Sequence, residues 1–396
     1  MQVEEDTVVK LPSGVIQGAV VAVVLGVVGT AAGLLRGGTD AWTMLLVHFL
    51  YWTGIAQGMV VWSAILRATQ ATWAPGVSRL GRAAVWFLPW SVAVFLLLWF
   101  GGREHWLPWL REPPHGKEAW LNPTFFFWRE LGILAVMAGL SAWLVHEYRR
   151  AEGDGLPATE AAHARLNRTA IALVIAYAFL YTVLAFDLVM SLDPHWFSSL
   201  LGAYFFVGNL YLSMGALIIA GALFGVPLGL ADLLGPRQFR DMGNLMLGFG
   251  LLTTGFFFAQ YLTIWYGNLP EETSFLIRRA YAQPWANVGY VVLFAAYLGP
   301  FLLLCFPQIK ASARRLVPVA ALVCFGMAVE RWMLVAPTLA PNQNINILFD
   351  NILKHVTFQA LAFGGLLVLV MTRSLQRRPK ASPLDTSLEL SEGVAL

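Results

Sequence analysis

The stretch TAIALVIAYAFLYTVLAFDLVM (169–190) decides the fold class, because its one charged residue, Asp187, stands among mainly apolar side chains. A helix that crosses a bilayer needs about 20 mostly apolar residues. Backbone groups inside lipid must satisfy one another, so this stretch is expected to be an α-helix. It therefore predicts one membrane-spanning helix with a carboxylate near one end.

Nine further stretches have the same character, so the sequence predicts an all-α polytopic membrane protein with ten transmembrane helices. The chain is 58% hydrophobic and 12% charged, whereas soluble domains carry roughly 25% charged residues. We expect one integral membrane domain over 1–396, with a head at 1–12, helices within 13–373 and a polar tail at 374–396. The expected spans are 13–35, 41–68, 80–101, 123–147, 168–191, 198–224, 243–266, 285–306, 312–336 and 351–373.

Spans two to five and spans six to nine are expected to form two four-helix bundles, flanked by the first and last spans. A repeated spacing supports this division. Asp187 lies seven residues before Pro194 near the end of span five, and Glu330 lies seven residues before Pro337 at the end of span nine.

The distribution of basic residues predicts the orientation. If the N-terminus is cytoplasmic, the cytoplasmic segments contain 17 Lys and Arg residues and the opposite loops contain 6. Cytoplasmic loops carry the excess of Lys and Arg, so both termini are expected in the cytoplasm. The acidic start (Glu4, Glu5 and Asp6) does not resemble a cleavable signal peptide. The net charge of +3 does not indicate a nucleic-acid partner.

Unusual sequence is concentrated in the loops expected outside. SLDPHWFSS (191–199) contains Asp193 and His195, and NLPEETSF (268–275) follows span seven. The Trp-rich loop at 102–122 is expected to lie on the membrane surface, where Trp is favoured. Loops on a rigid scaffold commonly carry function, so these segments are candidates for contact with partners.

With this orientation, ionisable and polar residues within the spans lie in the outer third of the membrane. His48, for example, lies seven residues into span two, or roughly 10 Å deep at 1.5 Å per residue. Charges inside a bilayer are costly and commonly functional. The residues concerned are His48, Arg129, Glu130, Asp187, Gln260, Tyr261, Glu330, Arg331, Lys354 and His355.

Arg129–Glu130 and Glu330–Arg331 are adjacent in sequence, and residues i and i+1 do not face each other on a helix. Each charge is therefore expected to have its partner on another helix or loop, with Asp187 a candidate for either arginine. Buried ion pairs that only fix helix register are the alternative. Asp193 could also cap span six, and His195 could lie among the lipid headgroups.

Oxidation of a lipid-soluble quinol suits such a group of residues. A His and a carboxylate can hydrogen-bond the two ring oxygens, and a desolvated carboxylate can take up a proton. The candidates for proton transfer are Asp187, His48, Glu130, Asp193 and His195, and those for holding the quinone are His48, Arg129, Asp187, Gln260, Tyr261, Glu330 and Arg331. Cys305 and Cys324 form no C-x-x-C motif, so no metal site, iron–sulfur cluster or c-type haem is expected in the chain.

Four segments resemble the NrfD-like, or polysulfide-reductase-type, integral membrane subunits. They are FLYWTGIAQGMVVWSAILR (49–67), MSLDPHWFSSLLGAYFF (190–206), FAQYLTIWYGNLPEETSF (258–275) and ERWMLVAPTL (330–339). They are most similar to the ActF-type subunits of alternative complex III, a bacterial quinol:electron-acceptor oxidoreductase. The resemblance covers roughly 40–375 and implies ten helices in two four-helix bundles.

The resemblance also implies a setting in the bacterial cytoplasmic membrane, with menaquinone as the expected quinone. The implied partners are an iron–sulfur subunit, haem c subunits and a paralogous NrfD-like membrane subunit. The resemblance implies that the larger of the two paralogues oxidises quinol. The modest length of this chain favours the shorter one, for which the resemblance implies proton conduction, so quinol oxidation in this chain itself stays open. Candidates for a path through the inner half are Tyr177, Tyr181, Thr182, Asn209, Ser213, Asp241, Asn244, Thr253 and Thr254.

Three other functions remain open. The chain could be a structural scaffold of such a complex without chemistry of its own. It could be a secondary transporter, because Pro89, Pro300 and Pro318 interrupt three spans. It could be a haem b anchor that uses His48 and His355 as axial ligands.

Overall fold

The computed structural model describes residues 13–36, 38–71, 73–112, 115–152, 159–227, 230, 233–340 and 352–376, and these contain helices and loops but no strand. Within them, ten helices are long and apolar enough to cross a membrane, which confirms the predicted fold class. These helices are Ser13–Leu35, Thr39–Ala68, Pro75–Trp106, Pro123–Ala151, Glu160–Leu192, Leu201–Phe224, Pro236–Gly267, Trp285–Leu304, Ala313–Leu339 and Lys354–Gln376.

The first bundle is formed by spans two to five. Helix α2 (Thr39–Ala68) packs against α4 (Leu88–Trp106) and α6 (Glu160–Leu188), and α5 (Pro123–Glu152) packs against both α4 and α6. The third span begins with α3 (Pro75–Ala83) and the short turn η1 (Ala84–Phe87). Helix α2 is apolar on nearly all sides and is buried over most of its length, as expected for a central helix.

The second bundle is formed by spans six to nine. Helix α7 (Leu201–Phe224) packs against α8 (Pro236–Gly267) and α13 (Ala313–Leu339). The eighth span is interrupted, because a π-helical segment, η5 (Leu293–Leu298), separates α10 (Trp285–Val292) from α11 (Gly299–Leu304). The short helices α9 (Pro270–Ala280) and α12 (Pro307–Lys310) lie in the loops before and after this span.

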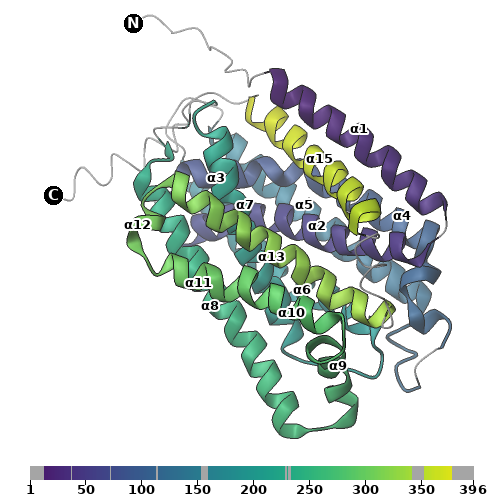
Figure 1. Cartoon of the computed structure of the whole chain (residues 1–396). Helices are drawn as coiled ribbons and strands as arrows, with labels where there is room; N and C mark the ends of the chain where they lie inside the picture. Colours follow the sequence, from purple (N-terminus) through teal and green to yellow (C-terminus); the bar gives the residue numbers. More distant parts are fainter. Residues whose placement is uncertain are drawn as a thin grey trace, which may run out of the picture.

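The two bundles meet along α2 and α7 (Figure 1). Glycines on α2 make this contact close. A Cβ atom at Gly54 would overlap the Asn209 side chain, and one at Gly58 would overlap Ser213. Small residues let membrane helices approach in this way, so the bundles form one continuous core.

Outside the bundles, α1 (Ser13–Leu35) packs antiparallel to α15 (Thr357–Gln376), which follows the π-helical turn η6 (Ile352–Val356). A Cβ at Gly26 would overlap the Ala362 backbone, and one at Gly29 would overlap the Phe358 ring. Helix α15 in turn packs against α2, α3 and η1. The first and last spans are therefore neighbours, as Figure 1 shows.

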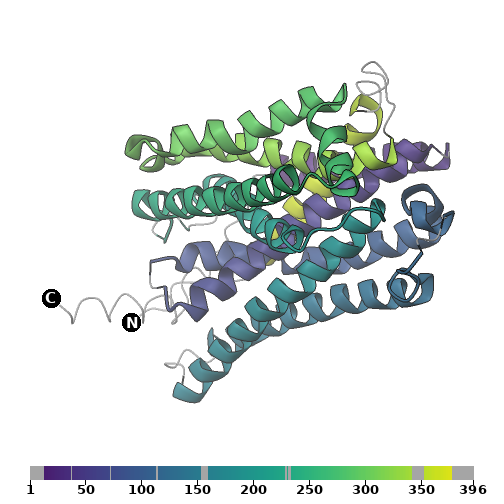
Figure 2. The ribbon, with the colours of Figure 1, turned by 90° about the horizontal axis from the view of Figure 1, so that it is seen from below.

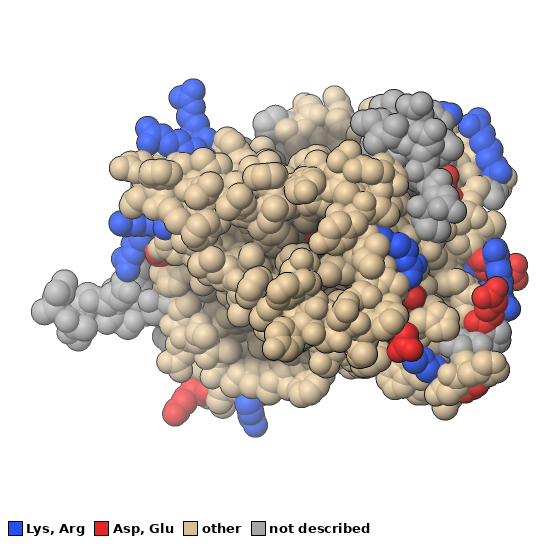
Figure 3. All heavy atoms as spheres, turned by 60° about the horizontal axis from the view of Figure 1, so that its bottom comes forward, with Lys and Arg blue, Asp and Glu red and all other residues tan. Residues whose placement is uncertain are grey.

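Charged side chains are concentrated at two ends of the molecule, with an almost uncharged band between them (Figure 3). The helices run roughly side by side across this band (Figure 2). We call one end the Asp187 end and the other, where Arg82 is buried, the Arg82 end.

The segment after α4 differs from its expected position on the membrane surface. Trp106 and the short turn η2 (Pro108–Leu110) fold back into the Asp187 end, so Trp106 and Trp109 are buried with 0% and 2% exposed surface. Their rings pack on Phe126 of α5 with centroids 6.4 and 5.4 Å away. The surface expectation was therefore wrong for these two residues, because their indoles fill the end of the first bundle.

Candidate functional site

The centre of the candidate site is Asp187, which lies in the last turn of α6 and is fully buried. Its Oδ2 atom lies 2.5 Å from Nε of Arg129 on α5, and its Oδ1 atom accepts a hydrogen bond of 2.9 Å from Nε1 of Trp120. The predicted pairing of Asp187 with an arginine is confirmed for Arg129. Both carboxylate oxygens are thus held by side chains from other parts of the first bundle.

Arg129 also stacks on the aromatic rings around it. Its guanidinium carbon lies 4.0 Å from the centroid of Trp120 and 4.4 Å from that of Phe125. Such cation–π contacts are strongest where the cation is desolvated. Arg129 is therefore held between an acid and two rings, although it lies close to the protein surface.

Glu130, the next residue on α5, is also fully buried and interacts electrostatically with Asp187, Arg129 and Tyr181. Neither of its carboxyl oxygens forms a hydrogen bond of normal geometry with a described residue. A buried polar atom without a partner is unusual and requires an explanation. The explanation here is the neighbouring carboxyl group of Asp187, with which Glu130 interacts, since two adjacent acids can share a proton.

A cavity of about 360 Å³ lies beside this group at the Asp187 end. Trp120, which donates to Asp187, lines the cavity together with Phe186 and Met190, which flank Asp187 on α6 and on the short turn η3 (Met190–Leu192). Lys117 also lines it and donates to the Pro194 carbonyl at 2.5 Å. Small-molecule sites typically measure about 300–1,000 Å³ and are mostly apolar with a few polar groups, and this cavity fits that description.

The second buried acid, Glu330, lies in the second bundle and accepts a hydrogen bond of 2.5 Å from the Tyr204 hydroxyl. It also forms an ion pair with its neighbour Arg331, which donates to Oδ1 of Asn209 at 2.9 Å. The expectation that adjacent charges need separate partners was therefore wrong for this pair. Tyr204 and Asn209 both belong to α7 and draw the two side chains toward the same helix.

Tyrosines connect the two acids across the centre of the protein. The rings of Tyr177 and Tyr181 on α6 lie 4.5 Å apart, and Tyr181 interacts with Glu130. Tyr177 contacts Asn209, the residue that holds Arg331, and donates to the Phe206 carbonyl at 2.9 Å. The buried acids of the two bundles thus belong to one polar network.

His48 does not join this network in the described residues. It faces α15, where its ring stacks on Phe363 with centroids 6.1 Å apart and interacts with the Val356 backbone. Its Nδ1 atom accepts a hydrogen bond of 3.2 Å from Nε1 of Trp52. The structure therefore does not bring His48 and Asp187 together, because His48 faces α15 whereas Asp187 is held by Arg129 and Trp120.

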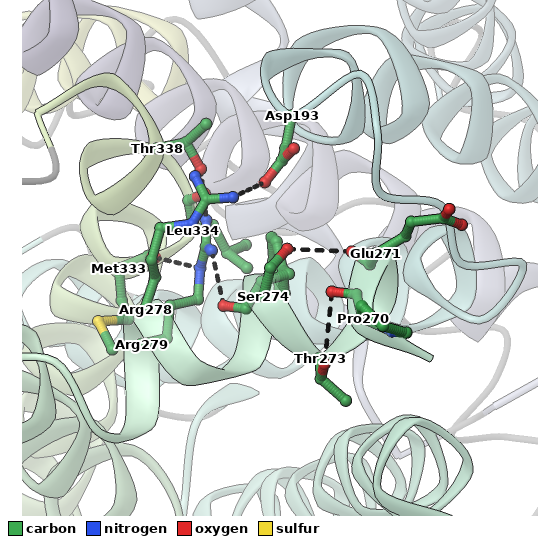
Figure 4. Close-up of polar contacts among 11 residues, drawn as sticks. Asp193, Pro270, Glu271, Thr273, Ser274, Arg278, Arg279, Met333, Leu334 and Thr338 are labelled. Atoms are coloured by element: carbon green, nitrogen blue, oxygen red, sulfur yellow. Dashed lines mark hydrogen bonds and ion pairs between the residues drawn. The ribbon is translucent and has the colours of Figure 1, made fainter. Parts of the chain in front are cut away.

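Asp193 binds the second bundle instead of capping span six. Its carboxylate lies 2.7 Å from Arg278 of α9, as Figure 4 shows. The next residue, Arg279, is buried and donates to the carbonyls of Met333 and Leu334 at 3.0 and 2.8 Å. Burial lowers the pKa of Arg279 to about 9, so this side chain is still cationic at neutral pH. Two adjacent arginines therefore fix α9 at the Asp187 end.

The remaining candidates lie apart from Asp187. His195 is exposed, and Gln260 and Tyr261 are half-buried on α8. Tyr261 contacts Tyr281, which follows α9. These positions fit a surface or membrane-interface role better than a place in the buried network.

Four of the nine residues expected to form a path through the inner half bond within their own helices. Thr253 and Thr254 donate to carbonyls one turn back at 2.7 and 2.8 Å, and Thr182 donates to Ala178 at 2.7 Å. Asn244 is exposed.

A different set of buried polar residues lies inside the first bundle. Thr53 donates to Ser91 at 2.9 Å, and one turn further along α2, Gln57 donates to Ser141 at 2.8 Å. Ser63 then donates to the Ser78 carbonyl at 2.9 Å near Arg82. Thr53 and Gln57 are spaced i, i+4, so the sequence alone could have predicted that these two polar side chains lie on one face of the second span.

No group of three or more His, Cys, Asp or Glu residues that could hold a metal ion occurs in the part of the chain that the structure describes. A scan against protein-family models finds no match for the sequence, and a search of curated proteins finds none either. The structure defines the class as a polytopic α-helical membrane protein with a buried acid–arginine network.

Proposed function

We propose that the chain is a quinone-interacting and proton-conducting membrane subunit of a bacterial quinol:electron-acceptor oxidoreductase of the alternative complex III type. The observation that carries the proposal is the buried Arg129–Asp187 pair beside a cavity of about 360 Å³. The sequence resemblance to NrfD-like subunits supports the same function. In this proposal the Asp187 end faces outward, where the iron–sulfur and haem c subunits dock, and a paralogous membrane subunit lies alongside.

The cavity fits a flat ring with polar oxygens. Its walls are mostly aromatic and apolar, with Lys117 and the Ser191 side chain as polar groups. When bound there, quinol would supply two electrons to the partner subunits and two protons. Glu130 lies beside Asp187 and interacts with it, so the two carboxyl groups together can take up a proton, while Arg129 stabilises the negative charge of Asp187.

The polar residues inside the first bundle support proton conduction toward the Arg82 end. Thr53, Ser91, Gln57 and Ser141 are all buried and lie in successive turns between the two ends. Interhelical hydrogen bonds of this kind also stabilise membrane helix packing. The same hydrogen bonds therefore also fit a second candidate function, that of a structural scaffold whose buried polar groups only hold the helices together.

Asp187→Asn in the assembled complex distinguishes the two functions. Asn keeps the shape of Asp but carries no charge, and a positioned acid or base typically contributes at least a hundredfold to rate. We expect normal assembly with at least a tenfold loss of quinol oxidation.

Glu147→Gln is the matched control, because Glu147 is a buried acid at the Arg82 end that pairs with Arg165 at 3.5 Å and accepts from Trp143 at 3.2 Å. Equal turnover in the Asp187→Asn and Glu147→Gln complexes would show that Asp187 serves only as scaffold.

A further inference from the structure

A second cavity lies in the second bundle, between α8 and the interrupted eighth span. Its volume is about 240 Å³, and its walls include Tyr211, Thr254 and Tyr297. Leu251 and Leu293 also line it and are 51% and 42% exposed. Both lie within the uncharged band of the molecule, so in a membrane the cavity opens sideways to lipid. Its occupant must therefore be soluble in the bilayer.

The π-helical segment η5 determines how Tyr211 is held. Pro300 has no N–H group, so the Ala296 carbonyl lacks its usual i+4 donor. The Tyr211 hydroxyl takes that place and donates to Ala296 at 2.7 Å. A Cβ at Gly250, another wall residue, would lie 3.4 Å from the Tyr211 oxygen, which places the phenol end at this wall. Segments of π-helix occur frequently at functional sites.

The hydroxyl hydrogens of the other two polar wall residues are also used. Thr254 donates to the Gly250 carbonyl at 2.8 Å. Tyr204 gives its only hydroxyl hydrogen to Glu330, so the 3.0 Å bond between Tyr297 and Tyr204 has Tyr297 as its donor. All three wall hydroxyls therefore donate within the protein, and only their oxygen lone pairs remain to accept hydrogen bonds.

We propose that this cavity binds the head of a hydroquinone from the lipid and prefers it to the oxidised quinone. A hydroquinone offers two O–H donors, whereas a quinone offers only acceptors and would leave the wall oxygens without partners. The site rests on the proposed function, because quinol is the substrate named there, but it is separate from the cavity beside Asp187. The Tyr297–Tyr204–Glu330 contacts link it to the buried network.

The test uses the full chain in phosphatidylcholine nanodiscs and a hydroquinone that carries a photoreactive diazirine on its tail, kept reduced by dithionite. We expect labelled peptides from α8 and from 293–304. Unlabelled hydroquinone should compete at least tenfold better than its dimethyl ether, which keeps the ring and both oxygens, has no O–H donor and is not changed by dithionite. Equal competition by the dimethyl ether, or by diacylglycerol with its single hydroxyl, would overturn the proposal.

Matched variants test whether the hydroquinone labels the chain from within the cavity. Leu251→Trp should reduce labelling at least tenfold by filling the opening, while Leu252→Trp, at a neighbouring position that is 46% exposed and outside the cavity, should not. Thr254→Val and Tyr297→Phe should each weaken binding about fivefold, the effect expected for one lost hydrogen bond. Thr263→Val is the control, because Thr263 makes the same bond to its own helix away from the cavity.

The outcomes separate this site from the proposed function. Labelling that is confined to the cavity beside Asp187 overturns the second site and leaves the proposed function standing. Labelling that is absent from the whole chain overturns both. Labelling at α8 that Leu251→Trp does not reduce also overturns the site, because the label then reports contact from the lipid.

Discussion

Nε of Arg129 on α5 lies 2.5 Å from Oδ2 of Asp187 on α6, and the carboxylate of this pair is fully buried. The pair joins two consecutive spans at the end where the loop between α4 and α5 folds inward. Removing one member of a buried pair leaves the other charge desolvated, which is why breaking such pairs typically costs about 3–5 kcal/mol.

A double-mutant cycle at this pair should therefore be strongly non-additive. We expect Arg129→Gln and Asp187→Asn each to lower the free energy of unfolding by about 3 kcal/mol, and the double variant to lose less than the sum of the two. Thermal or denaturant unfolding in detergent micelles measures the three values. Additive losses would mean that the charges do not stabilise each other.

The two adjacent arginines of α9 should differ sharply in their effect. Arg279 is buried against carbonyls of α13. Arg279→Met leaves the Met333 carbonyl without a donor, because the residue four positions later is Pro337, and should cost about 2–3 kcal/mol. The side chain of Arg278 is 33% exposed in its pair with Asp193, so Arg278→Met should cost less than about 1 kcal/mol. Hydrogen exchange over 268–284 should rise strongly in the first variant only.

Gly326 should not tolerate a side chain. A Cβ there would overlap the backbone of Ala295 and Ala296 in η5, so Gly326→Ala should cost at least about 1–3 kcal/mol. Gly132→Ala on α5 is the control, because nothing lies within 4 Å of its added methyl group. That change should be neutral or stabilising by about 0.5–1 kcal/mol in a helix. Melting temperatures of the two variants give the comparison.

The proposed orientation predicts which end can be labelled from outside. In a chain with Cys305→Ala and Cys324→Ala, Glu271→Cys should react with a membrane-impermeant thiol reagent in intact cells. Arg237→Cys, exposed near the start of α8, should react only after the cells are opened. The reverse pattern would place the Asp187 end in the cytoplasm.

The purified chain is expected to be colourless. The His48 ring stacks on Phe363, and its Nδ1 atom accepts a hydrogen bond from Trp52, so the ring is already engaged within the protein. A reduced-minus-oxidised spectrum with a stoichiometric haem b band would instead support the haem anchor.

Hydropathy was sufficient to predict the ten spans, because a bilayer imposes length and composition on any helix that crosses it. The partner of Arg129 was also predictable, since a lone buried charge needs an opposite one and Asp187 lay at matching depth. The direction in which the His48 side chain points could not be predicted from the sequence. Helix α2 is apolar on nearly all sides, so its sequence carries no signal for how it is rotated in the bundle.

The Glu330–Arg331 pair shows a second limit. Spacing rules describe Cβ directions, whereas long side chains bend toward whichever neighbour offers a bond. Here Tyr204 and Asn209 of α7 supply those bonds. The register between α7 and α13 comes from packing of the whole bundle and cannot be obtained from either helix alone.

The antiparallel contact of α1 with α15 has a consequence for biosynthesis. Most contacts of α1 are with α15, the last of the ten spans to leave the ribosome. Throughout translation, α1 therefore waits in the bilayer with Gly26 and Gly29 uncovered, while both bundles assemble beside it. The contact between α1 and α15 can form only after α15 has left the ribosome, so a nascent chain stalled before α15 would leave Gly26 and Gly29 of α1 without their partners.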